Sequence, residues 1–196
     1  NVSADQDQNE TTHPDQSDLR ALEGFNPNEK LLGYLLKHGI TTIQSGPGPA
    51  NPIAGQAGIF KTHGRTSQDM LVRFPSAMIF TFGESPKNTY RAQRRRPSTR
   101  LGTAAFIRER LNAAVEYDRE WRQWEKSQDQ LKRPKRDLKL DALGLVIQKK
   151  IPALMTAHRS DDIMTALRLT REFKLRTILD GATEGYVVAD HIFKAG

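Results

Sequence analysis

The sequence predicts an α/β fold in which several parallel strands alternate with helices. Short β-branched or continuously apolar runs recur along the chain, and amphipathic segments with helical spacing separate them. Because the two periodicities alternate rather than cluster, a parallel sheet with covering helices is favoured. The chain has 196 residues, whereas a complete (β/α)8 barrel takes about 250. We therefore expect fewer strands than such a barrel contains.

The first half of the chain is expected to contribute one helix and several short strands. Residues 1–24 are acidic and lack periodicity, which predicts an arm or loop. Residues 26–39 predict a helix that Asn26 or Asn28 can cap and Gly39 can end. After it we expect a strand at 40–44, a Gly/Pro-rich loop at 45–58, a possible hairpin of strands 59–64 and 69–74, and a strand at 76–83.

The second half alternates regularly between helix and strand. A long helix is expected from Ser98 or Thr99 to about Lys126, because its apolar residues recur at helical spacing. Beyond Pro134 we expect a helix at 136–150, a strand at 151–157, a helix at 160–174 with Ser160 as N-cap, a strand at 175–180 and a helix at 183–195. A further strand would follow, so we expect the chain to be a segment of a longer α/β protein.

Composition excludes some classes of function and leaves others open. The chain contains no cysteine, which excludes disulfides, thiolate metal sites and cysteine nucleophiles. No apolar run approaches the ~20 residues that span a membrane. The compartment stays open between cytoplasm and periplasm or secretion, because a leader could precede Asn1.

The basic residues are concentrated in two segments. The formal net charge is +7, and residues 87–100 and 132–139 carry much of the excess. Such patches can attract nucleic acid. However, Tyr90 is the only aromatic residue in 87–100 and no nucleic-acid motif accompanies it. A solvated surface, or charge partners elsewhere in a larger chain, is the simpler interpretation.

Polar residues follow three of the expected strands. Glu84 comes after the strand at 76–83, His158 after the strand at 151–157, and Asp180 ends the strand at 175–180. Because active sites of parallel α/β folds gather at the carboxyl ends of strands, the three side chains can converge. Simpler roles are open for each: Glu84 as a solvated loop residue, Asp180 as a helix cap, and His158 as a hydrogen-bonding partner of the next turn.

Most common catalytic motifs are absent. The sequence has no HExxH pair, no Gly-x-Ser-x-Gly elbow and no Walker loop, since the Gly/Pro-rich loop lacks the Gly-Lys-Ser/Thr ending. Asp161 and Asp162 are most simply first-turn acids, which the helix dipole favours.

Five ordered segments nevertheless resemble the middle of metal-dependent amidohydrolases, in their imidazolonepropionase-like branch. The similarity runs from about residue 5 to 196, and its segments are 39–64, 80–90, 95–121, 135–173 and 178–196. The resemblance implies a partial (β/α)8 TIM-type barrel over residues 25–196 that lacks its first and last strands. It also implies one or two divalent metals, commonly zinc, whose bound hydroxide attacks a C–N bond of an amide or peptide.

The resemblance assigns only part of a metal centre to this chain. His158 matches the first of the family's two later histidines, Glu84 is a plausible middle-strand carboxylate, and Lys61 is a weaker candidate for a modified lysine. Gly181 stands where the second later histidine is expected. The family's His-x-His pair and its catalytic aspartate fall outside this chain, so we expect the segment alone to be inactive. The remaining candidates, which would contact substrate or support the ligands, are Lys61, Lys87, Arg159, Asp180 and Glu184.

Two other functions stay open at this point. One is a degenerate, non-catalytic relative that binds ligands in the barrel, motivated by Gly181. The other is a basic nucleic-acid-binding domain, motivated by the arginine run. For the hydrolase we expect a small-molecule amide or peptide substrate, no membrane partner and no nucleic acid. A homo-oligomer is compatible with the sequence.

Overall fold

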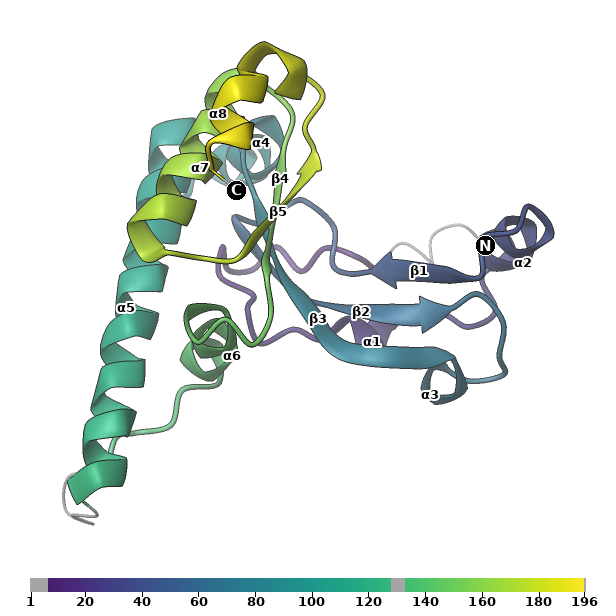
Figure 1. Ribbon diagram of the computed structural model, residues 1–196, viewed down its shortest axis with the longest axis horizontal. Coiled ribbons are helices and arrows are strands. Elements are labelled where there is room, and N and C mark those ends of the chain that lie inside the picture. Colours follow the sequence, from purple (N-terminus) through teal and green to yellow (C-terminus); the bar gives the residue numbers. More distant parts are fainter. Residues whose placement is uncertain (1–6, 128–132, 196) are drawn as a thin grey trace.

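The computed structural model describes residues 7–127 and 133–195 and contains a curled five-stranded sheet with helices along one face (Figure 1). The strands lie in sequence order. They are β1 Thr42–Ser45, β2 Ile53–Lys61, β3 Leu71–Thr81, β4 Ala153–Ala157 and β5 Thr177–Gly181. Pairs β3–β4 and β4–β5 are parallel, whereas β1–β2 and β2–β3 are antiparallel. The expectation of parallel strands is therefore right for β3–β5. The expected hairpin of 59–64 and 69–74 is found in the antiparallel β2–β3 pair, and β1 extends it to a meander.

The helices cover one face of the parallel strands and form the main core there. The long helix α5 Arg100–Ser127 lies beside α6 Leu138–Ile147 and α7 Ser160–Phe173 (Figure 1). Against them pack alternate residues of the strands, among them Met78, Phe80 and Met155, all fully buried. The intervening residues therefore point to the opposite face. A curled sheet with one helix-covered face is compatible with part of a barrel.

Strand β3 is longer than the sequence suggests. Two strands were expected, at 69–74 and 76–83, but both lie in one strand that continues through Pro75. Pro75 has no N–H to donate to a neighbouring strand. It lies opposite the point at which the β2–β3 register shifts, between Ala57 and Ile59. The pairing of β3 with β4 begins only later, at Met78. The missing donor therefore costs no ladder hydrogen bond to β4. The 45–58 loop is correspondingly shorter, because β2 already begins at Ile53.

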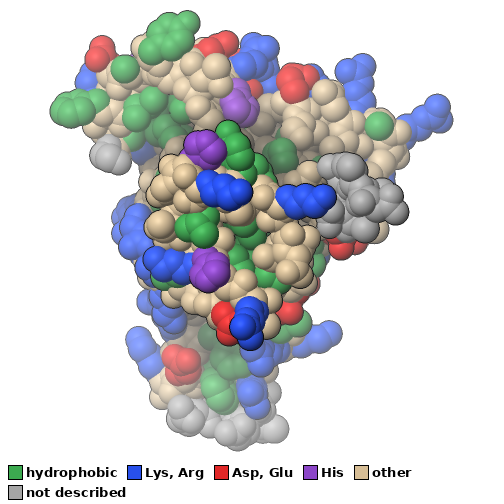
Figure 2. All heavy atoms as spheres, turned by 90° about the vertical axis from the view of Figure 1, so that its right-hand side faces the viewer, with side chains coloured by type: hydrophobic (Ala, Val, Ile, Leu, Met, Phe, Trp, Pro, Cys, Tyr) green, Lys and Arg blue, Asp and Glu red, His purple; other side chains and the backbone are tan. Residues whose placement is uncertain are grey.

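The outer halves of β1–β3 form an arm that projects from the rest of the molecule (Figure 1). Helices α2 Lys30–Lys37 and α3 Ser67–Met70 lie on this arm, with a separate small core around Leu32, Phe60 and Met70. Seen from its end, the arm shows hydrophobic side chains interspersed with lysines, arginines and histidines (Figure 2). The exposed hydrophobic residues include Leu31, Tyr34, Leu36, Ile40 and Val72.

Helix boundaries agree with expectation at several ends and differ at others. Gly39 has φ +85° directly after α2, as expected of a helix-ending glycine. The helix begins later than expected, because the Glu29 side chain, rather than Asn26 or Asn28, accepts from the Leu31 N–H at 3.1 Å. At the other end of the chain, the expected helix 183–195 is a 3-10 turn, η2 Gly185–Val188, followed by the short α8 Ala189–Phe193.

Helix α4 Glu84–Ala92 was not expected from the sequence. Gly83, with φ +87°, turns the chain from β3 directly into this helix, and Pro86 is tolerated in its first turn. Its Tyr90 is fully buried and donates to Asn51 Oδ1 at 2.5 Å. The basic segment at 87–100 therefore begins on a helix that is anchored to the loop before β2.

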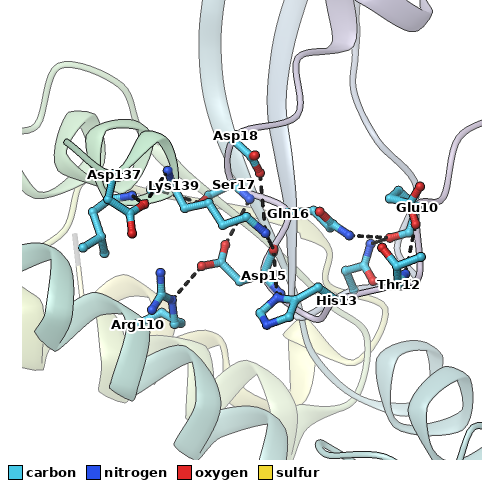
Figure 3. Close-up of polar contacts among 12 residues, drawn as sticks. Glu10, Thr12, His13, Asp15, Gln16, Ser17, Asp18, Arg110, Asp137 and Lys139 are labelled. Atoms are coloured by element: carbon cyan, nitrogen blue, oxygen red, sulfur yellow. Dashed lines mark hydrogen bonds and ion pairs between the residues drawn. The ribbon is translucent and has the colours of Figure 1, made fainter. Parts of the chain in front are cut away.

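The described part of the N-terminal segment lies packed against the helices (Figure 3). Asp15 is fully buried; its Oδ2 accepts from Arg110 Nε of α5 at 2.6 Å and its Oδ1 from the Ser17 N–H at 3.0 Å. Lys139 of α6 donates to the Asp15 carbonyl. Residues 7–20 are mainly irregular and are followed by the short α1 Ala21–Gly24. The segment predicted to be an arm or loop is thus bound to the fold from Gln8 onward, where the Gln8 carbonyl accepts from the Gly48 N–H at 2.7 Å.

Among the described residues, no helix has the length and apolar character needed to cross a membrane.

Candidate active site

Three polar side chains form a row across the carboxyl ends of the parallel strands. Thr81 of β3 is in register with Thr156 of β4, and Thr156 with Asp180 of β5. The three lie on the face of the sheet opposite the helices. Thr156 Oγ1 donates to Asp180 Oδ2 at 2.9 Å, and Thr81 Oγ1 is buried without a hydrogen-bond partner in the described part of the chain. Ligands of α/β sheets bind at this edge, which makes the row the centre of the candidate site.

A cavity of about 280 Å³ opens beside this row. Thr156 and Asp180 line it together with Ile79 and Leu154, which lie two residues earlier on β3 and β4. The Gly/Pro-rich loop after β1 closes another side. A β-carbon on Gly46 would meet the end of the Ile79 side chain and lie 3.1 Å from Ala57 Cβ, so the glycine lets this loop pack closely on the sheet. The loop therefore shapes the cavity with its backbone.

His158 lies directly after β4 and is exposed. Its Nδ1 is 2.8 Å from Thr183 Oγ1, and its carbonyl accepts from the Glu184 N–H at 2.8 Å. Either His158 tautomer can make the contact with Thr183, because a hydroxyl both donates and accepts. The turn after β5 thus fixes the imidazole at the edge of the sheet, with Nε2 available to a ligand.

Gly181 lies against the His158 ring. A β-carbon on Gly181 would be 2.6 Å from His158 Cε1, closer than any side chain allows, and the residue has φ +76°. The position where the resemblance leads one to expect a second histidine is therefore shaped for glycine. The carboxylate of Asp180, the preceding residue, accepts from Thr156, and Glu184 rather than Asp180 is the N-cap of the following η2.

Glu84 lies at the start of α4 and is paired with a lysine of the same helix. Its Oε2 is 2.5 Å from Lys87 Nζ, and this contact is the main reason why the pKa of Glu84 is lowered. No hydrogen bond or ion pair between described residues joins Glu84 to His158. The two expected metal ligands thus follow neighbouring strands, Glu84 at the start of α4 and His158 directly after β4, but are held by separate partners.

The buried Asp162 lies next to this pair. A β-carbon on Gly83, the residue before Glu84, would lie 2.9 Å from Asp162 Oδ2. Burial is the main cause that raises the pKa of Asp162. Arg100 Nη1 is 3.7 Å from Asp162 and 2.9 Å from Asp161. Asp162 was read from the sequence as a first-turn acid only; its place on the buried, apolar side of α7 could have shown that it faces inward.

Arg159 and Glu184 make contacts that stabilise the start of α7. Glu184 Oε2 accepts from the Ser160 N–H at 2.8 Å and from the Ser160 hydroxyl at 3.0 Å, and these bonds lower the pKa of Glu184. Arg159 pairs with Asp161 at 3.1 Å. The expected N-cap role of Ser160 is wrong, because Ser160 is the first residue of the helix and Arg159 precedes it as N-cap. The carboxylate of Glu184 satisfies the helix terminus instead.

Lys61 is remote from this edge. It ends β2 and donates to Thr42 Oγ1 at 3.0 Å, at the outer end of the arm. The antiparallel register places Ile53, at the other end of β2, opposite Phe80. The intervening length of strand is on the order of 30 Å. Lys61 therefore does not meet His158 within this fold.

The described residues do not make a metal centre by themselves. No group of three or more His, Asp or Glu side chains among them could hold a metal ion. Gly181 contributes no side chain, the Glu84 carboxylate is occupied by Lys87, and His158 is the one histidine at this edge. The residues present therefore do not fit a complete metal site.

The curled sheet, its helix-covered face and the polar row define an α/β protein with polar residues at the carboxyl ends of its parallel strands. Among solved structures, an amidohydrolase from Thermotoga maritima MSB8 is similar, with 34% sequence identity and a TM-score of 0.92 over 96% of this chain. The alignment covers 49% of that protein, so this chain spans about half its length. The chain thus has an amidohydrolase-like fold. No protein-family model matches the sequence, and a comparison with curated proteins gave no match.

Proposed function

We propose that this chain is part of a hydrolase of carbon–nitrogen bonds, acting on a small-molecule amide or a peptide. The similarity to an amidohydrolase across almost the whole chain carries the proposal. The position of His158 at the carboxyl ends of the parallel strands supports it, since this is the edge at which α/β enzymes place their chemistry. The imidazolonepropionase-like branch and a homo-oligomeric state belong to the same proposal.

In this proposal His158 acts at the reacting group. With Nδ1 held by Thr183, its Nε2 can accept or deliver a proton at the substrate, or ligate a metal. The turn after β5 fixes the ring, because Gly181 lies against it and the Glu184 N–H binds its carbonyl. Thr156 orients the Asp180 carboxylate beside it. A histidine fixed in this way is preorganised for proton transfer or ligation.

Metal dependence is a separate part of the proposal. A divalent ion, zinc first, would supply an activated water, with His158 as one ligand and Glu84 as another once released from Lys87. The described residues provide too few donors for a closed site. Further ligands would have to come from outside them.

Two alternative functions receive less support. The close fit of the His158 ring on Gly181 suits a degenerate site as well as an active one, but no other observation favours a non-catalytic binding protein. In the basic segment 87–100, Lys87 is paired with Glu84 and Tyr90 is buried. The one aromatic side chain of this segment is therefore not available to stack on nucleic-acid bases.

Metal analysis and hydrolysis together test the proposal. The intact protein would be purified without chelators, its zinc, manganese and iron content measured by mass spectrometry, and its hydrolysis of a panel of N-acyl amino-acid amides followed. We expect a stoichiometric metal and hydrolysis of at least one amide that stops on chelation. Metal content that is the same in His158→Ala and wild type would refute the ligand role. Hydrolysis of no amide by the metal-loaded protein would refute the enzyme.

A further inference from the structure

The cavity beside the polar row contains an unpaired negative charge. Asp180 lines it, and within residues 7–127 and 133–195 its carboxylate accepts a single hydrogen bond, from the neutral Thr156 hydroxyl. No lysine or arginine lines this cavity, and no ion pair to Asp180 exists among the described residues. The chain as a whole has a net charge of +7. Asp180 is exposed, so its carboxylate is open to a ligand that enters this cavity.

The other lining groups are two neutral polar side chains, each of which can accept a hydrogen bond, and apolar side chains. The Gln44 side-chain N–H donates to Ser76 Oγ at 2.9 Å. The amide oxygen of Gln44 is therefore left to accept a hydrogen bond from a ligand. Ser45 adds a hydroxyl, while Ile79 and Leu154 supply apolar surface. An ammonium group donates three hydrogen bonds and accepts none, and its alkyl chain prefers apolar surface. These lining groups match such a ligand.

The cavity is close enough to His158 to share a substrate with it. Thr156 precedes His158 by two residues, a separation of about 7 Å along an extended chain. Asp180 accepts from Thr156, and the next residue, Gly181, lies against the His158 ring, so the Asp180 end of the cavity is near the imidazole. A flexible chain of a few carbon atoms can therefore reach from His158 to Asp180.

We propose that this cavity binds the ammonium group of a cationic amide substrate, with Asp180 as the residue that determines specificity. The inference rests on the proposed function for the amide. The recognition of the cation stands on the cavity alone. The expected substrate carries an amine on an alkyl chain, and its scissile amide lies next to His158. Neutral and anionic analogues of the same length should bind less well, because they leave the Asp180 carboxylate without a counter-charge.

Binding of small probes tests the cavity without any hydrolysis. Calorimetry or ligand-observed NMR on the intact protein would compare butylammonium, 1-butanol and butyrate, which differ mainly in charge. We expect butylammonium to bind best, and its affinity to fall about tenfold in Asp180→Asn. Asp190→Asn, an exposed aspartate of α8, is the matched control and should bind like wild type. Equal binding of the three probes, or equal affinity in wild type and Asp180→Asn, would overturn the proposal.

Hydrolysis separates this inference from the proposed function. The rates for Nα-acetyl-lysine amide and Nα-acetyl-norleucine amide would be compared in wild type and Asp180→Asn. We expect wild type to prefer the lysine derivative through a lower KM, and Asp180→Asn to lose that preference. Hydrolysis without any preference would refute the cation subsite and leave the hydrolase intact. Binding of butylammonium without hydrolysis of either amide would refute the hydrolase and leave the subsite intact.

Discussion

The His158 ring lies against Gly181, so closely that a β-carbon on Gly181 would be 2.6 Å from His158 Cε1. Gly181 also has φ +76°. Gly181→Ala should therefore destabilise the intact protein by about 1–3 kcal/mol, through backbone strain and displacement of the ring. Urea unfolding measures this loss. Gly33→Ala, in the middle of α2 with open space around it, is the control and should not destabilise. A Gly181→Ala protein as stable as wild type would show that the contact is not tight.

The buried pair Asp15–Arg110 should stabilise the fold strongly. Arg110 Nε is 2.6 Å from Asp15 Oδ2, and the aspartate is fully buried. Asp15→Ala would leave the partly buried guanidinium without its counter-charge, and we expect a loss of about 3 kcal/mol in the free energy of unfolding. Glu116→Ala, which removes an exposed partner of Arg119, should change it by less than about 0.5 kcal/mol. Equal effects of the two substitutions would contradict a packed N-terminal segment.

Asp162 should make stability fall as pH rises. Burial raises its pKa above the ordinary value of 3.8, so the folded protein binds its proton more tightly than the unfolded chain does. Between 3.8 and the raised pKa, ionisation therefore costs folding free energy. Asp162→Asn removes this cost, so its stability relative to wild type should increase from pH 4 upward and then level off. Urea unfolding of both proteins at pH 4, 5, 6 and 7 measures the difference in their free energies of unfolding. A difference that does not change with pH would show that the pKa of Asp162 is not raised.

Glu184 should have the opposite dependence on pH. Hydrogen bonds from Ser160 lower its pKa below 4.5, so its contribution is complete above that pH and is lost as pH falls through the lowered value. Glu184→Gln should lower the melting temperature at pH 7 and lose its effect in acid. Hydrogen exchange of the first turn of α7 should accelerate at the same time, because the cap is weakened. Unchanged exchange there would refute the capping role.

Patterns that depend on local periodicity could be predicted from the sequence. Helix α5 and the alternation of β4, α7 and β5 follow the expected residues closely, because each element has its own apolar spacing. Helix α4 was missed because Gly83 and Pro86 look like loop residues. The one long strand through Pro75 depends on register with β2, which no local pattern contains.

The candidate site was predictable to a similar extent. The place of His158 after β4 follows from strand order, and the same alternation could have indicated Thr156, two residues earlier. The Glu184 cap on α7 and the distance of Lys61 depend on tertiary packing. The pairing of Glu84 with Lys87 is local to α4 and was missed because that helix was not expected. Asp15 looked like part of a solvated acidic segment because its partner, Arg110, lies 95 residues away.

The central claim is that His158 acts in a hydrolase site at the carboxyl ends of β3–β5. The most direct measurement is kcat/KM for hydrolysis of an amide substrate by the intact protein, in wild type, His158→Ala and His191→Ala. His191 lies on α8, outside the polar row, and serves as the matched control. We predict that His158→Ala lowers kcat/KM at least about a hundredfold and that His191→Ala leaves it unchanged. Equal kcat/KM in His158→Ala and wild type would contradict the account.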